Sequence, residues 1–249
     1  MMYSAFADFY DELTGNISYA ERANYFDSII KEFKTEGPIL LDLACGTGSL
    51  SVEFARLGYD VIGIDNSADM LSVALEKKYE TGQDILFLCQ DMTDLDLYGT
   101  VDTTVCALDS INHVTDPKKV KEIFKGVSLF TVPGGLFLFD VNSPYKHRSV
   151  LGNNTFVYDC DSVYCVWQNE FEEKNDTVHI SLDFFAYDEE SDSYTRSSEQ
   201  FSERSYEPQW LEELLDETGF DLLAVYGDDS RESPKEDTQR LIYVARKRK

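Results

Sequence analysis

A short glycine-containing loop carries the first residues whose types and spacing point to chemistry. The run from Asp42 to Gly48 reads DLACGTG and follows directly on the apolar residues 39–41. Glycines let a ligand approach the bare backbone, and a helix that starts at such a loop favours an anionic group at its N-terminus. The loop therefore predicts a nucleotide-type cofactor, and by itself it does not say which one.

Two acidic residues near the loop help to separate two kinds of cofactor. Asp42 lies within the strand end immediately before the glycines, where a carboxylate would repel the pyrophosphate of a dinucleotide but would suit the cationic amino group of a methionine moiety. Asp65 ends the next apolar run, where its carboxylate can accept hydrogen bonds from ribose hydroxyls, which both cofactors carry. Ser51 stands where the dinucleotide pattern wants a small residue and does not violate it. Asp42 therefore favours S-adenosylmethionine over NAD(P).

A second group of polar residues follows the fourth β-like run and supplies a candidate base. His113 lies on the side of the expected sheet where open α/β proteins bind ligands, and the ordinary pKa of histidine, about 6.5, suits a proton acceptor. Asp109 is the competing base, or an anchor for a substrate cation. A structural hydrogen bond is the alternative for His113, and His147 and His179 have weaker cases.

The elements that must position these residues alternate along the chain. Short β-branched runs and amphipathic segments follow each other, which is typical of βαβ units and a parallel sheet. Ser67 and Asp116 are placed to cap helices, and Gly58 and Gly219 follow helix ends. Strands are expected at 39–43, 60–65, 85–90, 101–107, 135–141, 220–226 and 241–246. Helices are expected at 19–33, 48–57, 67–79, 116–130 and 208–217.

This order predicts a doubly wound α/β fold with an inserted antiparallel part. Residues 38–144 and 207–249 are expected to form a mostly parallel, seven-stranded Rossmann-like sheet with helices on both faces, after an N-terminal helical segment at 1–37. Residues 145–206 break the alternation and read as antiparallel strands joined by polar turns. This insertion is expected to serve as a lid over one end of the sheet or as the contact surface of a homodimer. Its strands are expected at 155–158, 163–167, 178–184 and 201–204, with a hairpin tip at 188–193.

Several motifs resemble the successive motifs of class I S-adenosylmethionine-dependent methyltransferases. The match spans about residues 38–141. The N-terminal pattern Tyr3-Ser4-x-Phe6-Ala7-x-x-Tyr10-Asp11 and the phrase DSINH at 109–113 further resemble a bacterial branch of small cytoplasmic methyltransferases, similar to the small-molecule N-methyltransferases. That second resemblance covers nearly the whole chain. The class I motifs are 42–48, Gly63-Ile64-Asp65, Gln90-Asp91-Met92 and Pro133-Gly134-Gly135.

The resemblance implies roles for the residues around the glycine loop. Gly46 and Gly48 would line the cofactor, and Asp42 would contact the methionine amino group directly or through water. Asp65 would hold the ribose. The neighbours that complete this half of the expected site are Ala44 and Asn66.

The resemblance also implies an adenine site after the third strand. Asp91 would accept a hydrogen bond from the adenine amino group, the backbone at Met92 would meet a ring nitrogen, and Met70 would pack on the adenine face. The alternatives are that Asp91 caps a turn and that Met70 is an ordinary core residue. The residues expected near the sulfonium are Ala107, Leu108 and Tyr10, of which Tyr10 has a packing role as its alternative.

Composition limits the partners and the compartment. The chain has 249 residues, with 47 Asp plus Glu against 22 Lys plus Arg and a formal net charge of -25. A field of that sign repels phosphate backbones, so a nucleic-acid substrate is disfavoured and a small-molecule methyl acceptor is expected. The sequence contains neither the roughly 18 to 20 apolar residues of a membrane span nor a secretory signal, so a cytoplasmic protein is expected. The five cysteines predict neither a disulfide framework nor a zinc site.

These observations predict an enzyme that transfers a methyl group from S-adenosylmethionine by in-line displacement. Such a reaction depends mainly on alignment and on exclusion of water, and positioning of this kind supplies roughly 7 to 11 kcal/mol. The alternatives are an NAD(P)-dependent oxidoreductase and a non-catalytic adenosylmethionine-binding protein. The sequence leaves nitrogen, oxygen and carbon acceptors open.

Overall fold

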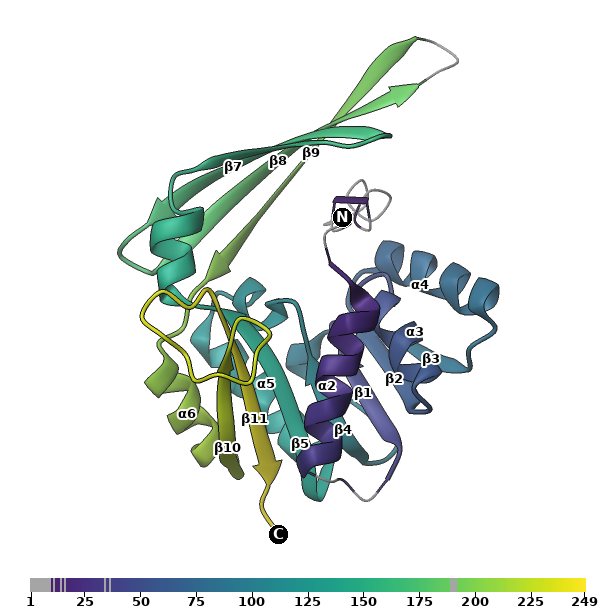
Figure 1. Cartoon of the computed structure of the whole chain (residues 1–249), viewed down its shortest axis with the longest axis vertical. Helices are drawn as coiled ribbons and strands as arrows, with labels where there is room; N and C mark the ends of the chain where they lie inside the picture. Colours follow the sequence, from purple (N-terminus) through teal and green to yellow (C-terminus); the bar gives the residue numbers. More distant parts are fainter. Residues whose placement is uncertain are drawn as a thin grey trace.

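A seven-stranded sheet forms the centre of the computed structural model, which describes residues 10, 12–13, 15, 17–33, 35, 37–188 and 192–249. Its strands are β1 (Ile39–Leu43), β2 (Asp60–Asp65), β3 (Ile85–Cys89), β4 (Val101–Cys106), β5 (Thr131–Asn142), β10 (Phe220–Gly227) and β11 (Arg240–Lys247). They are ordered β10-β11-β5-β4-β1-β2-β3, and β11 is antiparallel to both of its neighbours while the other pairs are parallel (Figure 1). The predicted mostly parallel α/β sheet is confirmed.

Helices cover both faces of this sheet, and the alternation of side chains along β5 shows why. Leu136 and Leu138 pack with α2 (Tyr19–Phe33) and α3 (Ser49–Arg56), whereas Phe137 and Phe139 pack on the opposite face with α5 (Pro117–Phe130) and α6 (Pro208–Glu217). Because successive strand residues point to opposite faces, one apolar strand serves two cores. No helix in the described part of the chain is both long and apolar enough to cross a membrane. A further helix, α4 (Ala68–Thr81), connects β2 to β3.

The helix boundaries follow the capping residues that the sequence indicated. The Ser67 side chain accepts a hydrogen bond from the backbone N–H of Met70 at 3.2 Å, and Asp116 accepts one from Lys118 at 2.9 Å. Gly219, with a φ of +86°, follows the C-terminal end of α6 in the left-handed region that favours glycine. These caps are confirmed, and the described helix at the N-terminus spans the predicted residues 19–33.

One core strand is longer than predicted. β5 begins at Thr131, four residues before the expected start, because Thr131 already pairs with Val101 on β4. The register then shifts, and the ladder resumes where Leu136 pairs with Thr103. The Pro133-Gly134-Gly135 turn signal, read as a strand boundary, therefore lies inside an irregular strand.

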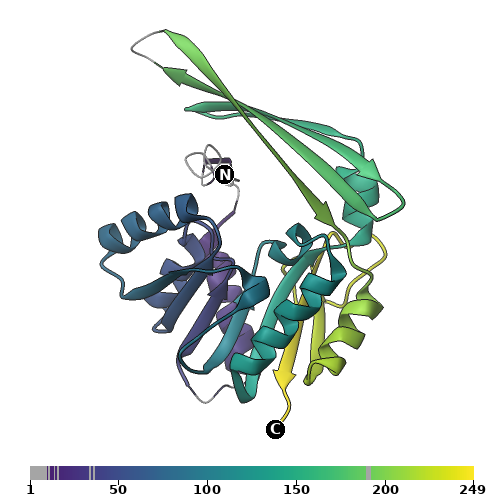
Figure 2. The ribbon, with the colours of Figure 1, turned by 180° about the vertical axis from the view of Figure 1, so that it is seen from behind.

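The predicted insertion forms a separate antiparallel sheet that arches over the carboxyl ends of the core strands (Figures 1 and 2). Its last strand was predicted from 201 but begins at Ser193, because the polar first half of that strand pairs along the whole length of its neighbour. The residues at its hairpin tip, 189–191, lie outside the described residues. A π-helical turn, η3 (Lys146–Leu151), connects the core to this sheet. The strands, in sheet order, are β6 (Thr155–Asp159), β7 (Val163–Glu172), β8 (Thr177–Asp188) and β9 (Ser193–Arg204).

Candidate active site

A cavity of about 980 Å³ lies between the carboxyl ends of the core strands and the insertion sheet. Most of the residues predicted from the sequence line it, although they come from five separate segments. Those that do are Tyr10, Ala44, Gly46, Asp65, Asn66, Met70, Asp91, Met92, Leu108, Asp109 and His113. Asp42, Gly48 and Ala107 are not among the lining residues.

The two glycines of the loop have different surroundings. Both have positive φ angles, +54° at Gly46 and +71° at Gly48, which side-chain-bearing residues rarely adopt. Apart from its chain neighbours, no heavy atom of the described residues lies within 4 Å of the position that a Cβ would take on Gly46, whereas a Cβ on Gly48 would stand 2.8 Å from the Phe87 ring and 2.9 Å from Ala74. Gly46 therefore faces open space in the cavity, and Gly48 allows α4 and β3 to pack against the loop.

Asp65 ties the end of β2 to the glycine loop. One carboxylate oxygen accepts the Gly46 backbone N–H at 2.9 Å, and the other accepts that of Ser67 at 2.8 Å. Burial raises the pKa of Asp65, and these backbone hydrogen bonds oppose the rise. Since a carboxylate oxygen has more than one lone-pair site, Asp65 can accept further hydrogen bonds from a ligand in the cavity.

Asp42 lies behind the loop. Its side chain is only 2% exposed, and its carboxylate accepts a hydrogen bond from the Ser51 hydroxyl at 2.5 Å. Burial raises the pKa of Asp42 to about 7, against the lowering effect of the Ser51 hydrogen bond. The Asp42 carboxyl group is thus partly protonated near neutral pH. It therefore repels a pyrophosphate less strongly than the sequence suggested.

In the adenine site expected after β3, one residue both caps a turn and lines the cavity. Asp91 accepts the backbone N–H of Thr93 at 2.8 Å and caps the short turn η1 (Met92–Asp94). It lines the cavity together with Met92 and Met70, and Met70 is 5% exposed. Asp91 thus caps a turn, which was the alternative to adenine binding, and its position also lets it reach the cavity.

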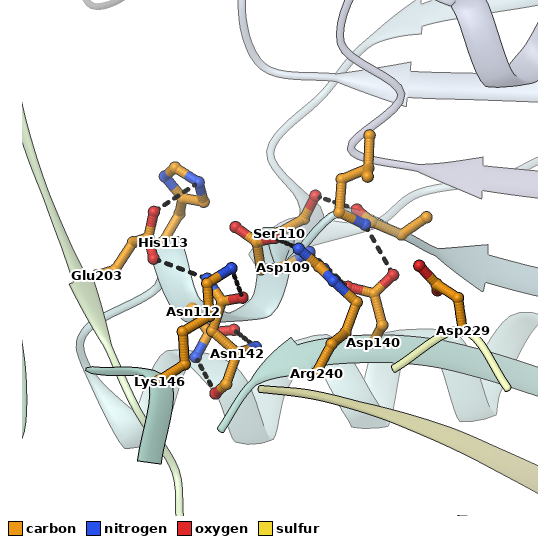
Figure 3. A network of polar contacts seen from close by, with 12 residues as sticks. Asp109, Ser110, Asn112, His113, Asp140, Asn142, Lys146, Glu203, Asp229 and Arg240 are labelled. Carbon is orange, nitrogen blue, oxygen red and sulfur yellow. Dashed lines mark hydrogen bonds and ion pairs between the residues drawn. The ribbon is translucent and has the colours of Figure 1, made fainter. Parts of the chain in front are cut away.

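A buried acid that the sequence analysis missed holds the backbone after β4. Asp140, fully buried on β5, accepts the backbone N–H of Leu108 at 2.9 Å and that of Asp109 at 2.7 Å. Leu108 and Asp109 have left-handed φ angles of +58° and +54°. Strained backbone of this kind persists where the surroundings fix it and is concentrated at functional sites. Arg240 supplies a positive charge that balances Asp140 (Figure 3), and Arg22 supplies a second one.

Asp109, one of the two candidate bases, is engaged in an ion pair. Its carboxylate accepts a hydrogen bond from Arg240 at 2.5 Å. Burial alone would raise the pKa of Asp109, but the charges of Arg240 and Lys146 outweigh burial and hold the pKa below its ordinary value. A carboxylate stabilised in this way is a weak base.

His113, the other candidate base, stands on η2 (Ser110–His113) between the core and the insertion. Its Nε2 atom lies 3.6 Å from a carboxylate oxygen of Glu203 (Figure 3), and its ring stacks on Phe201 at 5.2 Å between centroids. Both partners belong to β9. We call the part of the cavity beneath the insertion the upper chamber; its wall includes Asp109, His113, Tyr158, Trp167, Phe201 and Glu203.

Asn112 joins three elements beside this chamber. Its side-chain amide donates to the Arg204 carbonyl at 2.8 Å, and its side-chain oxygen accepts the backbone N–H of Asn142 at 2.9 Å. The turn η2 is therefore bonded to the ends of both β9 and β5. The sequence held a signal that could have predicted Asp140 and Asn142 as site residues, because an acid and an amide stand at the end of an apolar run. Glu203 and Arg240 stand in no recognisable pattern.

Comparisons with known proteins agree with this geometry. Residues 40–135 match the family model described as "Methyltransferase domain". The chain is similar over its full length to YqeM of Bacillus subtilis (strain 168), whose name proposes a methyltransferase, with 35% identity and 98% of that protein covered. It is 28% identical over 97% of its length to the glycine/sarcosine N-methyltransferase of Halorhodospira halochloris, of which it covers 87%.

A solved structure shows the same architecture. The S-adenosylmethionine-dependent methyltransferase from Clostridium acetobutylicum ATCC 824 superposes with a TM-score of 0.90 and 33% identity, and 99% of each chain is covered. The match includes the antiparallel sheet as well as the core, since nearly the whole of both chains is aligned. The family model, the full-length relatives and this solved structure agree on the fold, the cofactor and the enzyme class. The chain belongs to the class I S-adenosylmethionine-dependent methyltransferases.

Proposed function

We propose that the protein transfers a methyl group from S-adenosylmethionine to the amine nitrogen of a small molecule. The upper chamber carries this proposal, because carboxylates and aromatic rings line it together. Asp109 and Glu203 face a space that Tyr158, Trp167 and Phe201 also border. Aromatic faces and nearby carboxylates are the groups that bind alkylammonium ions. The Halorhodospira relative is named a glycine/sarcosine N-methyltransferase, which supports the same choice.

The lower half of the cavity fits the cofactor. Gly46 leaves open space at the backbone, and Asp65 is held by two backbone N–H groups at the end of β2 with acceptor capacity left for ribose hydroxyls. A volume of about 980 Å³ lies at the upper end of the range of ligand pockets, so a second molecule can be bound beside the cofactor. We place the cofactor on Gly46, Asp65, Asp91 and Met92, with Ala44, Asn66, Met70 and Leu108 around it.

His113 is the residue that we assign to proton removal. When bound, S-adenosylmethionine supplies a methyl group on a cationic sulfur, and an amine must be unprotonated to take that methyl group. His113 would take the proton of an ammonium ion held in the upper chamber, which exposes the nitrogen lone pair. Asp109 is less suited to that role because Arg240 and Lys146 stabilise its charged form. We assign Asp109 to binding of the cationic acceptor, together with the chamber aromatics.

A matched set of acceptors tests the proposal. The protein is incubated with S-adenosylmethionine carrying a deuterated methyl group and with primary amines, each paired with the alcohol of the same carbon skeleton. Mass spectrometry detects the labelled products. We expect labelled methyl groups on amines only, and greatly reduced transfer in His113→Gln. Labelling of the alcohols alone would contradict an amine acceptor.

Binding gives a second readout that needs no turnover. In the presence of S-adenosylhomocysteine, phenethylamine is expected to bind more tightly than phenethyl alcohol in calorimetry, because the chamber favours a cation. Equal affinity for the two compounds would contradict the cation-binding character on which the choice of an amine rests.

A further inference from the structure

Lys146 is a cation of the cavity wall that has no carboxylate partner in the described part of the chain. The residue is half-buried on η3, the turn that leads from β5 into the insertion. The half-buried arginines of the same wall, Arg22 and Arg240, each form ion pairs with two aspartates. Among the described residues, the Lys146 ammonium instead donates to an amide oxygen, Oδ1 of Asn142, at 2.8 Å.

The Asn142 side chain stands between Lys146 and Glu203 (Figure 3). Its oxygen accepts a hydrogen bond from Lys146, and its nitrogen donates one to Glu203 Oε2 at 3.2 Å. The two charges fix the orientation of the amide, because the cation requires the oxygen and the carboxylate requires the nitrogen. The Lys146 ammonium is thus held in place without pairing directly with the Glu203 carboxylate.

A half-buried ammonium group without a paired anion is costly. Burial lowers the pKa of Lys146, and the charge of Asp109 is the main influence that opposes this fall. An ammonium group has three N–H donors, and Asn142 occupies one of them. Carboxylate and phosphate oxygens form strong, charge-assisted hydrogen bonds with such donors. Lys146 therefore favours a ligand that carries an anionic group into the cavity.

The neighbouring charges favour a carboxylate over a phosphate. Asp109, to which we assign the cationic acceptor, attracts Lys146 more strongly than any other acid does, so a cation site and an anion site are adjacent in the wall. Arg240 occupies Oδ1 of Asp109, and no described residue occupies Oδ2. Asp109 and Glu203 would repel the two charges of a phosphate more than the single charge of a carboxylate. An α-amino acid carries one ammonium and one carboxylate on the same carbon.

We propose that the methyl acceptor is an α-amino acid, whose carboxylate binds the Lys146 ammonium while its amino group lies at Asp109. The proposal rests on the proposed function and narrows the amine to one that carries a carboxylate. Lys146 is then a specificity-determining residue, because it distinguishes the acid from amines without that group. The methionine part of the cofactor also carries a carboxylate. Lys146 stands on η3 beside the upper chamber, outside residues 44–92, which favours the acceptor as the source.

Calorimetry in the presence of S-adenosylhomocysteine tests the proposal with two probes of nearly equal shape, phenylalanine and phenylalaninamide. At about pH 6 the amino groups of both are protonated, so the probes differ in charge only at the carboxyl end. We expect phenylalanine to bind roughly tenfold more tightly than the amide, because a charge-assisted hydrogen bond is gained. Equal or weaker binding of the acid, or no binding of either probe, would overturn the proposal.

Two lysines of the same cavity give a matched pair of variants. Lys146→Met removes a half-buried charge, and Lys119→Met removes an exposed one. The preference for phenylalanine over the amide should fall to within about twofold in Lys146→Met and persist in Lys119→Met, because solvent screens an exposed charge. Lys146→Arg should keep part of the preference. A full preference in Lys146→Met would overturn the assignment, and the wild-type comparison decides the matter if that variant fails to fold.

S-adenosylhomocysteine without an acceptor tests the other source of a carboxylate. Its affinity for Lys146→Met should stay within about twofold of wild type, because the proposal assigns the ammonium to the acceptor. A loss of about tenfold or more, with the preference for phenylalanine intact, would assign Lys146 to the cofactor and overturn the proposal.

Methyl labelling separates this inference from the proposed function. Phenyllactate has the skeleton and carboxylate of phenylalanine, with a hydroxyl in place of the amino group. If amines are labelled but phenylalanine binds no better than its amide, the carboxylate site is overturned and amine methylation stands. If phenyllactate alone is labelled and its binding depends on Lys146, the carboxylate site stands and the amine acceptor is overturned.

Discussion

At the scale of single residues, burial decides what the two acids near the glycine loop can do. Asp65 is the last residue of β2 and Asp42 is the next to last residue of β1, but Asp65 lines the cavity while Asp42 is enclosed with the Ser51 hydroxyl. The sequence pattern predicted two acids at the carboxyl ends of neighbouring strands. It could not predict which side of the loop each carboxylate would face, because that depends on how α3 packs behind Asp42.

Replacing Asp65 should weaken the cofactor complex. In Asp65→Ala the charged hydrogen bonds to the ribose are lost, and we expect S-adenosylhomocysteine to bind about 1 to 3 kcal/mol more weakly in calorimetry. Asp60→Ala, at the exposed opposite end of β2, is the control and should bind as the wild type does. Equal affinity in Asp65→Ala and Asp60→Ala would remove Asp65 from the site.

Replacing Asp42 should change how stability depends on pH. The pKa of Asp42 is raised from 3.8 to about 7 in the folded protein, so the folded state binds more protons than the unfolded chain between these values. That contribution stabilises the fold at low pH and is lost as the pH rises towards 7. Asp42→Asn does not titrate, so the loss of unfolding free energy between pH 5 and pH 8 should be smaller by about 2 kcal/mol than in the wild type.

Denaturant unfolding at the two pH values measures this difference, with Asp60→Asn as an exposed control that should follow the wild type. If Asp42→Asn kept the full pH dependence of the wild type, the titration of buried Asp42 would not cause the pH dependence of stability.

At the scale of elements, the turn η2 connects the core to the insertion. Its Asn112 side chain is bonded to the ends of β9 and β5, and its His113 ring lies against Phe201. The short strands β1 and β2 were predictable because both of their faces are covered, so that the residues between their ends are mainly apolar. The polar first half of β9 was not, since its pairing with β8 depends on backbone hydrogen bonds rather than on apolar alternation.

Removing the Asn112 side chain should loosen that connection. In Asn112→Ala the buried Asn142 N–H loses its acceptor, which costs about 1 to 3 kcal/mol of unfolding free energy and should speed hydrogen exchange at Asn142. Asn153→Ala is the matched control, because Asn153 accepts the backbone N–H of Phe171 at an exposed position. Exchange at Asn142 that is as slow in Asn112→Ala as in Asn153→Ala would show that the amide does not hold these elements together.

At the scale of the whole molecule, charge and topology set what the site can receive. The cofactor half of the cavity comes from residues 44–92, which are close in sequence and carry recognisable motifs, so it was largely predictable. The upper chamber joins residues 109–113 to residues of β6, β7 and β9, and their contacts arise only when the insertion folds over the sheet. The division into three segments at 37, 144 and 206 stays a prediction, as does a homodimer.

The net charge of -25 should make stability depend on salt. Like charges spread over the surface repel one another, and salt screens this repulsion as the Debye length falls from about 10 Å at 0.1 M to about 3 Å at 1 M. We expect the calorimetric unfolding temperature to rise from 0.02 M to 0.5 M NaCl, roughly equally in KCl. A falling or constant unfolding temperature would mean that ion pairs such as Arg240 with Asp109 outweigh the repulsion.

The most direct measurement of the central claim is a crystal structure with S-adenosylhomocysteine bound. The account predicts the ribose hydroxyls on Asp65, the adenine beside Asp91 and Met92, and the sulfur open to the chamber that His113 and Glu203 share. A ribose away from Asp65, or a sulfur closed off from that chamber, would contradict methyl transfer to an acceptor beneath the insertion.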